Sequence, residues 1–172
     1  RGTAHLDLAR LGAEFAYTVD GERRGTLEDE TFSADGAVLT FTGVNTHPGF
    51  AKDKMANALK GAGALLARLE HDWSPEGTAG TDGFVHPYEV KGSVESTQIH
   101  FIMRSFRTPD LDVYADRLRS LATEVCAARP GLNFTLEVRE QYRSMKEILD
   151  RHPEVAEHAE TAMLRAGLTP ER

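Results

Sequence analysis

Three polar side chains occupy positions where their types could do chemistry, namely Asp20, His47 and Arg104. Asp20 ends the apolar run 14–20 and precedes Gly21, a pairing that is common in simple turns. A carboxylate at the end of a strand also suits a metal ligand, but a zinc site needs three or four ligands and no others lie nearby. Local sequence therefore leaves both interpretations of Asp20 open.

His47 belongs to the stretch Asn45-Thr46-His47-Pro48-Gly49, which is expected to be a loop between a strand and a helix. Many loop histidines are ordinary surface residues. A loop position nevertheless makes the ring available as a hydrogen-bond donor to a substrate. Asn45 stands beside it and can present its amide to the same group.

Arg104 lies in a predicted strand, residues 98–106, in which Ile99, Phe101 and Met103 take one face. The period of two places Arg104 on the opposite face. An arginine there is either a solvated side chain or a clamp for a carboxylate, because its planar fork donates two parallel hydrogen bonds.

Motif content, net charge and hydrophobicity exclude several classes of protein. No GxSxG, Gly-rich phosphate loop, CxxC or HExxH motif is present, and the other histidines lack metal-ligand spacing. The net charge of −7 argues against a nucleic-acid partner. No apolar run reaches the roughly 18–20 residues of a membrane span. The single cysteine, Cys126, fits an apolar helical pattern, so we expect a core residue and a reducing, cytoplasmic setting.

The elements that position these residues follow from hydrophobic periodicity. Apolar residues alternate in four predicted strands and recur every three or four positions in two predicted helices. In chain order the elements are residues 37–43, 52–70, 85–94, 98–106, a helix opened and capped by Thr108-Pro109-Asp110, and 132–139. This βαββαβ order predicts an α+β, ferredoxin-like two-layer sandwich with both helices on one sheet face.

The flanks give weaker signals. Residues 14–20 read as a strand, with 25–32 as a candidate partner, and residues 144–150 and 153–167 read as helices. The last helix has a thin apolar edge that the sandwich does not need, which suggests an absent domain. We therefore expect the sandwich to form one domain at residues 33–140, flanked by segments 1–32 and 141–172 that belong to another domain.

Seven stretches carry a resemblance to a known family when they are taken together and in order. They are residues 15–21, 45–52, 55–59, 74–76, 83–86, 91–95 and 100–104. Their order and spacing across residues 11–145 resemble the peptidase T family, cytoplasmic tripeptide aminopeptidases with two zinc ions. The chain looks like the lid or dimerisation domain of such an enzyme, at residues 33–140, between remnants of its catalytic domain at 1–32 and 141–172.

The resemblance implies a role for each candidate residue. Asp20 looks like a ligand to one zinc ion. His47 looks like the lid histidine that stabilises the oxyanion formed at the substrate carbonyl. Arg104 looks like the residue that grips the C-terminal carboxylate of the tripeptide, with help from Asn45. Lids of the family also imply a homodimer, formed through an edge strand or the face of the second helix.

The chain also departs from the family. The other zinc ligands and the general base, namely a His-x-Asp, a bridging Asp, a Glu-Glu pair and a final His, are not in these 172 residues. Phe50 replaces a small or hydroxyl residue. We therefore expect this segment to bind no zinc and to be inactive alone. The alternative is a stand-alone dimerisation or peptide-binding module without catalysis.

Overall fold

The computed structural model describes residues 6–19, 21 and 23–172. The chain divides into two compact units, Glu30–Ser144 and a second unit formed by Arg1–Asp29 with Met145–Arg172. These units rest on compactness alone, so the predicted division into a lid and two catalytic remnants stays a prediction.

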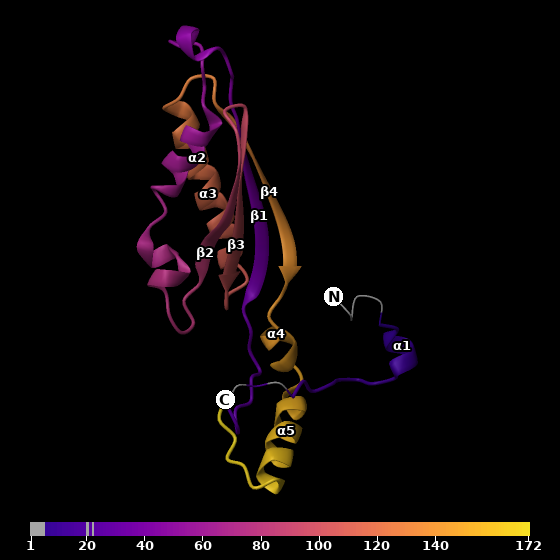
Figure 1. Ribbon diagram of the computed structural model, residues 1–172. Helices are drawn as coiled ribbons and strands as arrows, with labels where there is room; N and C mark the ends of the chain where they lie inside the picture. The colour runs from indigo at the N-terminus through magenta and orange to yellow at the C-terminus, as the bar shows by residue number, and fades with distance from the viewer. Residues whose placement is uncertain (1–5, 20, 22) are drawn as a thin grey trace. The chain divides into compact units, whose positions relative to one another are not determined.

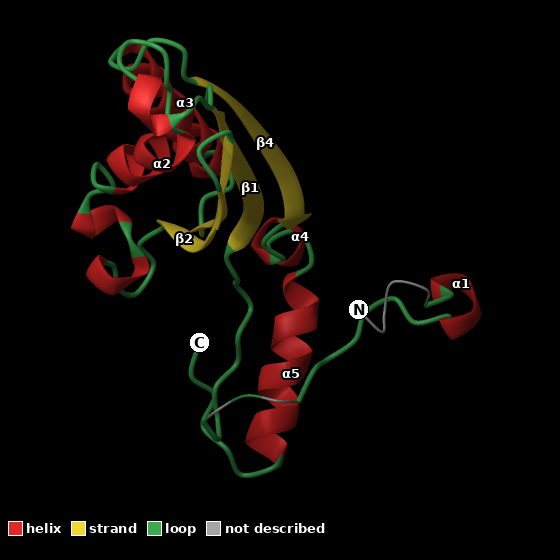
Figure 2. Cartoon of the chain, turned by 45° about the horizontal axis from the view of Figure 1, so that its top comes forward, coloured by secondary structure: helices red, strands yellow, loops and turns green. Residues whose placement is uncertain are grey.

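The Glu30–Ser144 unit is a four-stranded antiparallel sheet in the order β2-β3-β1-β4, with two main helices on one face (Figures 1 and 2). The chain order β1, α2, β2, β3, α3, β4 confirms the predicted α+β, ferredoxin-like sandwich. The elements are β1 Ser33–Thr42, α2 Ala58–Leu66, β2 Phe84–Gly92, β3 Ser96–Ser105, α3 Asp110–Ala127 and β4 Asn133–Tyr142. Two short 3-10 turns, His71–Trp73 and Pro75–Gly77, precede β2.

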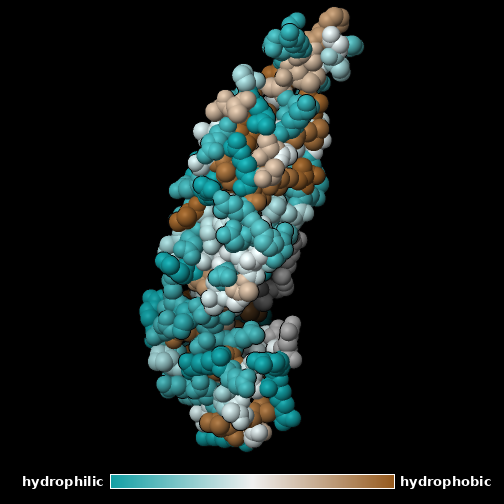
Figure 3. Space-filling view, turned by 90° about the vertical axis from the view of Figure 1, so that its left-hand side faces the viewer, coloured by the Kyte–Doolittle hydropathy of each residue, from teal (hydrophilic) through white to brown (hydrophobic). Residues whose placement is uncertain are grey.

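The core lies between the sheet and the two helices. Alternate residues of the central strands face it, and Leu39 on β1 stands directly opposite Ile99 on β3. Helix α3 contributes every third or fourth residue, as an amphipathic helix must. The larger buried side chains are Leu39, Phe41, Leu65, Val85, Ile99, Phe101, Met103, Leu111, Leu118, Leu121 and Val125. On the helical side, hydrophilic and hydrophobic residues are interspersed on the surface without one continuous apolar patch (Figure 3).

The starts of both helices differ from the prediction. Helix α2 begins at Ala58, six residues late, because the Asn57 side chain caps it by accepting from the Lys60 backbone N–H at 3.3 Å. Before it, Asp53 takes a left-handed φ of 57°, which no helix tolerates. The predicted side-chain cap of α3 is wrong, because the Thr108 hydroxyl bonds to Ser33 at 2.7 Å instead.

The two ends of the Glu30–Ser144 unit are tied to each other by buried polar contacts. The Ser144 backbone N–H donates to Ser33 Oγ at 2.9 Å. Arg143 Nη1 donates to Asp35 Oδ1 at 2.6 Å, and its Nη2 lies 3.1 Å from Glu140 Oε2. Asp35 is only 5% exposed. We call the pair of Asp35 and Arg143 the clasp; its hydrogen bond to Asp35 raises the pKa of Arg143.

The second unit holds three short helices, α1 Leu8–Leu11, α4 Lys146–Leu149 and α5 Pro153–Arg165. The strand predicted at residues 14–20 is wrong for its described part, because residues 14–19 form no ladder. In place of the strand predicted at 25–32, Thr26 makes one isolated bridge to Glu171. The Tyr17 hydroxyl instead donates to the Val155 carbonyl at 2.5 Å.

Candidate functional site

His47 sits in an exposed turn just after β1 and just before the 3-10 helix Pro48–Phe50. Its Nδ1 accepts a hydrogen bond from the Gly49 backbone N–H at 3.1 Å. In the neutral ring this contact places the proton on Nε2, so Nε2–H is a donor directed away from the turn. The turn thus selects the tautomer that can stabilise a negative oxygen.

The local sequence explains this turn. Pro48 has its φ fixed near the value that the first helical position needs. A Cβ at Gly49 would lie 3.2 Å from His47 Nδ1, so the small residue permits the close hydrogen bond. Phe50 is 71% exposed and its ring centre lies 5.5 Å from that of His47. The larger residue therefore covers one side of the imidazole without displacing it.

Asn45 lies at the same end of the sheet as His47. Its amide Nδ2 donates to Glu95 Oε1 at 3.3 Å, in the turn that joins β2 to β3. Val44 also bridges to Ala56, and the Gly43 N–H donates to the Glu95 carbonyl at 2.8 Å. These contacts hold the His47 loop against the β2–β3 turn. We call the end of the sheet that carries the His47 loop and the β2–β3 turn the hairpin end.

Arg104 lies on the sheet face that the helices leave open, as the period of two predicts. It stands opposite Ala34 on β1 and Phe84 on β2. Its Nε is buried and has no hydrogen-bond partner among the described residues. Three half-buried aromatic rings gather beside this register, with Phe32 4.2 Å from Phe106 and 5.8 Å from Phe84 between centres. Arg104 thus has a buried, unpartnered Nε at a register that also holds Phe84 of this aromatic group.

The structure separates Arg104 from the other two candidates. Arg104 pairs with Ala34 near the start of β1, whereas His47 and Asn45 follow Thr42 at its end. Eight residues of antiparallel strand between Ala34 and Thr42 span about 27 Å. His47 and Asn45 therefore belong together at the hairpin end, and Arg104 lies at the opposite end of the sheet.

Asp20 lies outside the described residues. Among the residues that the structure does describe, no three His, Cys, Asp or Glu side chains are grouped so as to hold a metal ion. The described residues therefore do not fit a zinc site by themselves. No helix in the described ranges is long and apolar enough to cross a bilayer.

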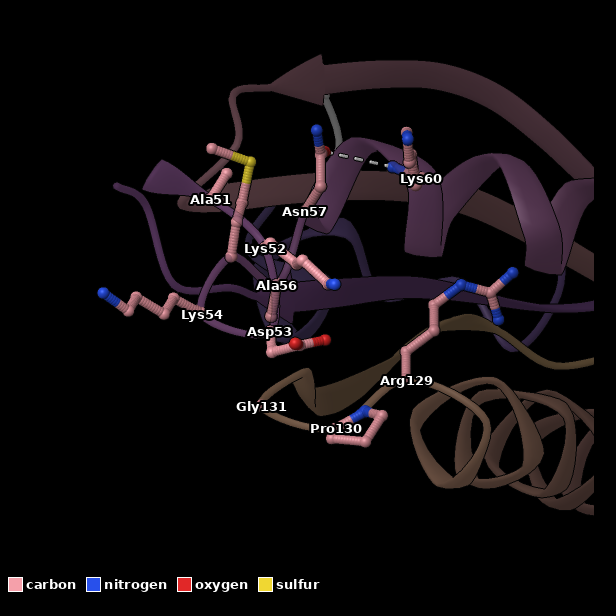
Figure 4. A pocket seen from close by; sticks show the side chains of 11 residues that line it. Ala51, Lys52, Asp53, Lys54, Ala56, Asn57, Lys60, Arg129, Pro130 and Gly131 are labelled. Atoms are coloured by element: carbon pink, nitrogen blue, oxygen red, sulfur yellow. Dashed lines mark hydrogen bonds between the residues drawn. The ribbon is translucent and has the colours of Figure 1, made fainter. Parts of the chain in front are cut away.

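Sequence reasoning missed a basic hollow of about 770 Å³, seen in Figure 4. The prediction assigned residues 52–57 to helix α2, which spread Lys52, Lys54 and Lys60 around a helical surface. In the structure the segment is a turn that lies against Arg129. The sequence feature that could have predicted this basic hollow is the presence of three lysines within nine residues.

Comparison with known proteins supplies the family. The family model described as "Peptidase dimerisation domain" matches residues 30–130. Peptidase T of Exiguobacterium sibiricum is 40% identical over 170 residues, which cover 99% of this chain and 41% of that protein. The chain thus spans less than half the length of this curated relative.

Solved structures show the same fold at low sequence identity. A tripeptidase from Staphylococcus aureus matches with a TM-score of 0.79 at 15% identity, over 98% of this chain and 44% of that one. The Bacillus subtilis YXEP protein, described as a dinuclear metal binding peptidase, matches with a TM-score of 0.56 at 13% identity, over 87% and 37%. With a homology to peptidase T that runs through nearly all of its length, the chain belongs to the peptidase dimerisation domain family.

Proposed function

We propose that this chain is the lid and dimerisation segment of a cytoplasmic, zinc-dependent aminopeptidase that releases the N-terminal residue of tripeptides. The homology to peptidase T supports the class of enzyme, and the likeness to a tripeptidase fold supports the substrate length. In this proposal both zinc ions are held largely by residues outside the chain, with Asp20 as one ligand. The segment alone is inactive.

Arg104 carries the proposal. A buried guanidinium nitrogen without a partner costs free energy, because burial removes water and nothing replaces it. A substrate carboxylate would supply the missing acceptor through a charge-assisted, bidentate pair. By binding the C-terminal carboxylate of the peptide, Arg104 would select substrates of one length.

His47 is proposed to stabilise the oxyanion. Its Nε2–H donor is exposed and its orientation is fixed by Gly49, so the turn is organised before the substrate binds. Asn45 has one amide N–H committed to Glu95, and its second N–H remains for the same substrate. Both groups act at the hairpin end.

The separation of the two ends requires a second subunit. A fully extended tripeptide spans about 10 Å, far less than the roughly 27 Å of strand between the Arg104 register and the end of β1. One lid therefore cannot place both Arg104 and His47 on one substrate. We propose that Arg104 of one subunit and His47 of its partner complete each site.

The proposed homodimer uses the outer edge of β4. In residues 30–144, all of which are described, β4 pairs with β1 alone, and its ladder keeps one register from Asn133 to Glu140, with a shift only at the end of the strand, between Glu140 and Tyr142. The opposite edge, β2, contains Pro87 and a register shift between Pro87 and Glu89, features that discourage further pairing. Two β4 strands related by a two-fold axis would join the sheets in an antiparallel manner.

The shared site predicts complementation in the full-length enzyme. His47→Ala and Arg104→Ala homodimers should each lose about 100-fold or more in kcat/KM. Mixing the two after dissociation should restore about a quarter of wild-type activity, because half the dimers are mixed and each has one intact site. The measurement is tripeptide hydrolysis before and after subunit exchange.

Two controls sharpen this test. His47→Ala exchanged with itself should gain nothing, and metal content should equal that of the wild type in both variants. If exchange of mixed subunits, verified by sedimentation, restores no activity, then both residues do not serve one shared site. Loss of metal in Arg104→Ala would show that Arg104 is not a carboxylate clamp.

A stand-alone dimerisation or peptide-binding module is the second candidate. The observation in its favour is the complete core of the Glu30–Ser144 unit. The reading frame on both sides of the segment would distinguish the enzyme from the stand-alone module. An upstream His-x-Asp and Glu-Glu with a downstream His would establish the enzyme, whereas a start codon near Arg1 would favour the module.

A further inference from the structure

The basic hollow lies at the hairpin end, between the turn before α2 and the turn after α3. Its wall is formed by residues 51–57, Lys60 and residues 129–131. Figure 4 shows the Lys52 amine and the Asp53 carboxylate between α2 and the Pro130–Gly131 turn, with Lys54 extending outward at the rim. Its volume of about 770 Å³ exceeds what a single ion needs and falls in the range of small-molecule sites.

The cations of this hollow differ from the others in the unit. Apart from Arg104, every Lys or Arg of residues 30–144 outside the hollow lies within 3.8 Å of a carboxylate oxygen. Lys52, Lys54, Lys60 and Arg129 form no ion pair with any described residue, and Arg129 donates only to the Val125 carbonyl. The unit thus leaves its cations free at two places, the Arg104 register and this hollow.

The balance of charge favours an anionic occupant. Four cations and one acid, Asp53, line the hollow, while the chain as a whole carries a net charge of −7. Like charges gathered around a concave surface repel one another, and a bound anion converts that repulsion into attraction. Asp53 weakens this attraction but leaves the wall positive.

The types of the cations indicate the class of anion. Three of the four are lysines, whose ammonium groups act as compact point charges and suit phosphate, while the one arginine adds a planar fork. The N-terminus of the nine-residue helix α2 also opens on the hollow at Asn57, so the positive end of the helix dipole adds to the field. We propose that the hollow binds a small phosphorylated molecule with at least two negative charges, such as one that carries a diphosphate.

A ligand bound in the hollow would also affect the His47 turn. The Ala51 N–H donates to the Pro48 carbonyl at 3.4 Å, and the Ala51 carbonyl accepts from Lys54 and Met55 at 3.1 and 3.0 Å. The His47 turn and the wall of the hollow therefore share Ala51. A ligand that orders Lys52 and Lys54 should shift the Gly49 amide signal, whether or not His47 takes part in catalysis.

The experiment titrates the 172-residue chain with inorganic pyrophosphate, by calorimetry and by amide NMR. We expect one saturable site whose affinity falls as salt rises. The variant Lys52→Gln/Lys60→Gln/Arg129→Gln should bind at least about tenfold more weakly. The matched control Arg68→Gln/Lys91→Gln/Arg117→Gln has the same charge change in paired cations and should stay within about twofold.

Several results would overturn the proposal. These are the absence of saturation up to about 10 mM pyrophosphate, an equal loss in both triple variants, or a hollow variant that changes only self-association. Should the triple variant unfold, Lys60→Glu alone must lower the affinity while the thermal midpoint is unchanged. Adenosine diphosphate as a second probe distinguishes the sources: tighter binding than pyrophosphate assigns an organic phosphate, and equal binding assigns the diphosphate group alone.

Discussion

At the scale of single residues, the chemical states of His47 and Arg104 depend on contacts that the fold brings together. The alternation of Ile99 and Met103 placed Arg104 on the open face, and the structure confirms it. The tautomer of His47 depends on a hydrogen bond from Gly49, a contact that no composition or period encodes. The unpartnered Nε of Arg104 depends on its neighbours across two strands, so it also emerges only from the fold.

Cys126 gives a prediction at this scale. Burial raises the pKa of its thiol, and nearby Arg129 lowers it by a smaller amount. Because the folded pKa is raised, less thiolate forms at pH 8 than in the unfolded chain. Iodoacetamide should modify native Cys126 at least about threefold more slowly than the same chain in urea, as measured by mass spectrometry. Equal rates would contradict a packed thiol.

At the scale of elements, strands followed from the sequence better than helix ends did. Strict alternation identified β1 and β3, because one face of each is buried. The start of helix α2 was predicted too early because Met55 continues the apolar spacing. In the structure the Asn57 cap and the left-handed φ of Asp53 prevent the helix from beginning before Ala58. Residues 14–19 were misassigned because a strand needs a pairing partner, which the local sequence does not reveal.

The clasp gives a prediction at the element scale. Arg143→Ala should lower the free energy of unfolding by about 2–4 kcal/mol, because Asp35 would be left buried and charged without its partner. Arg139→Ala removes an exposed pair with Glu137 and should cost less than about 1 kcal/mol. Urea denaturation of both variants supplies the comparison. Equal, small losses would mean that the clasp is dispensable.

At the scale of the whole molecule, the sequence predicted a homodimer. It did not decide whether the interface is an edge strand or the face of the second helix. The structure favours the edge, because β4 keeps one register from Asn133 to Glu140 while the outward face of α3 carries charged residues around Val113. Among the described residues, no His, Cys, Asp or Glu side chains are grouped so as to hold a metal ion. In the proposed enzyme this segment would supply position and charge, and residues outside it would supply most of the metal chemistry.

The β4 edge gives a prediction at the scale of the molecule. Thr135→Lys/Glu137→Lys places like charges along the proposed two-fold seam, so the dimer should dissociate at least about tenfold more readily. Tyr88→Lys places a charge on the β2 edge, at a side chain that is 53% exposed, and should leave the dimer intact. Sedimentation velocity over a dilution series measures both. A dimer weakened only by Tyr88→Lys would assign the interface to β2.

The interruption of β2 at Pro87 has a consequence for stoichiometry. If two sheets of residues 30–144 join through β4, two copies of β2 become the outer strands of the joined sheet. Each of these edges lacks one backbone donor at Pro87 and changes register beside it, so a third sheet finds no regular ladder to extend. Growth by strand addition would therefore stop at two chains, and a protein with an open sheet edge would form pairs rather than fibres.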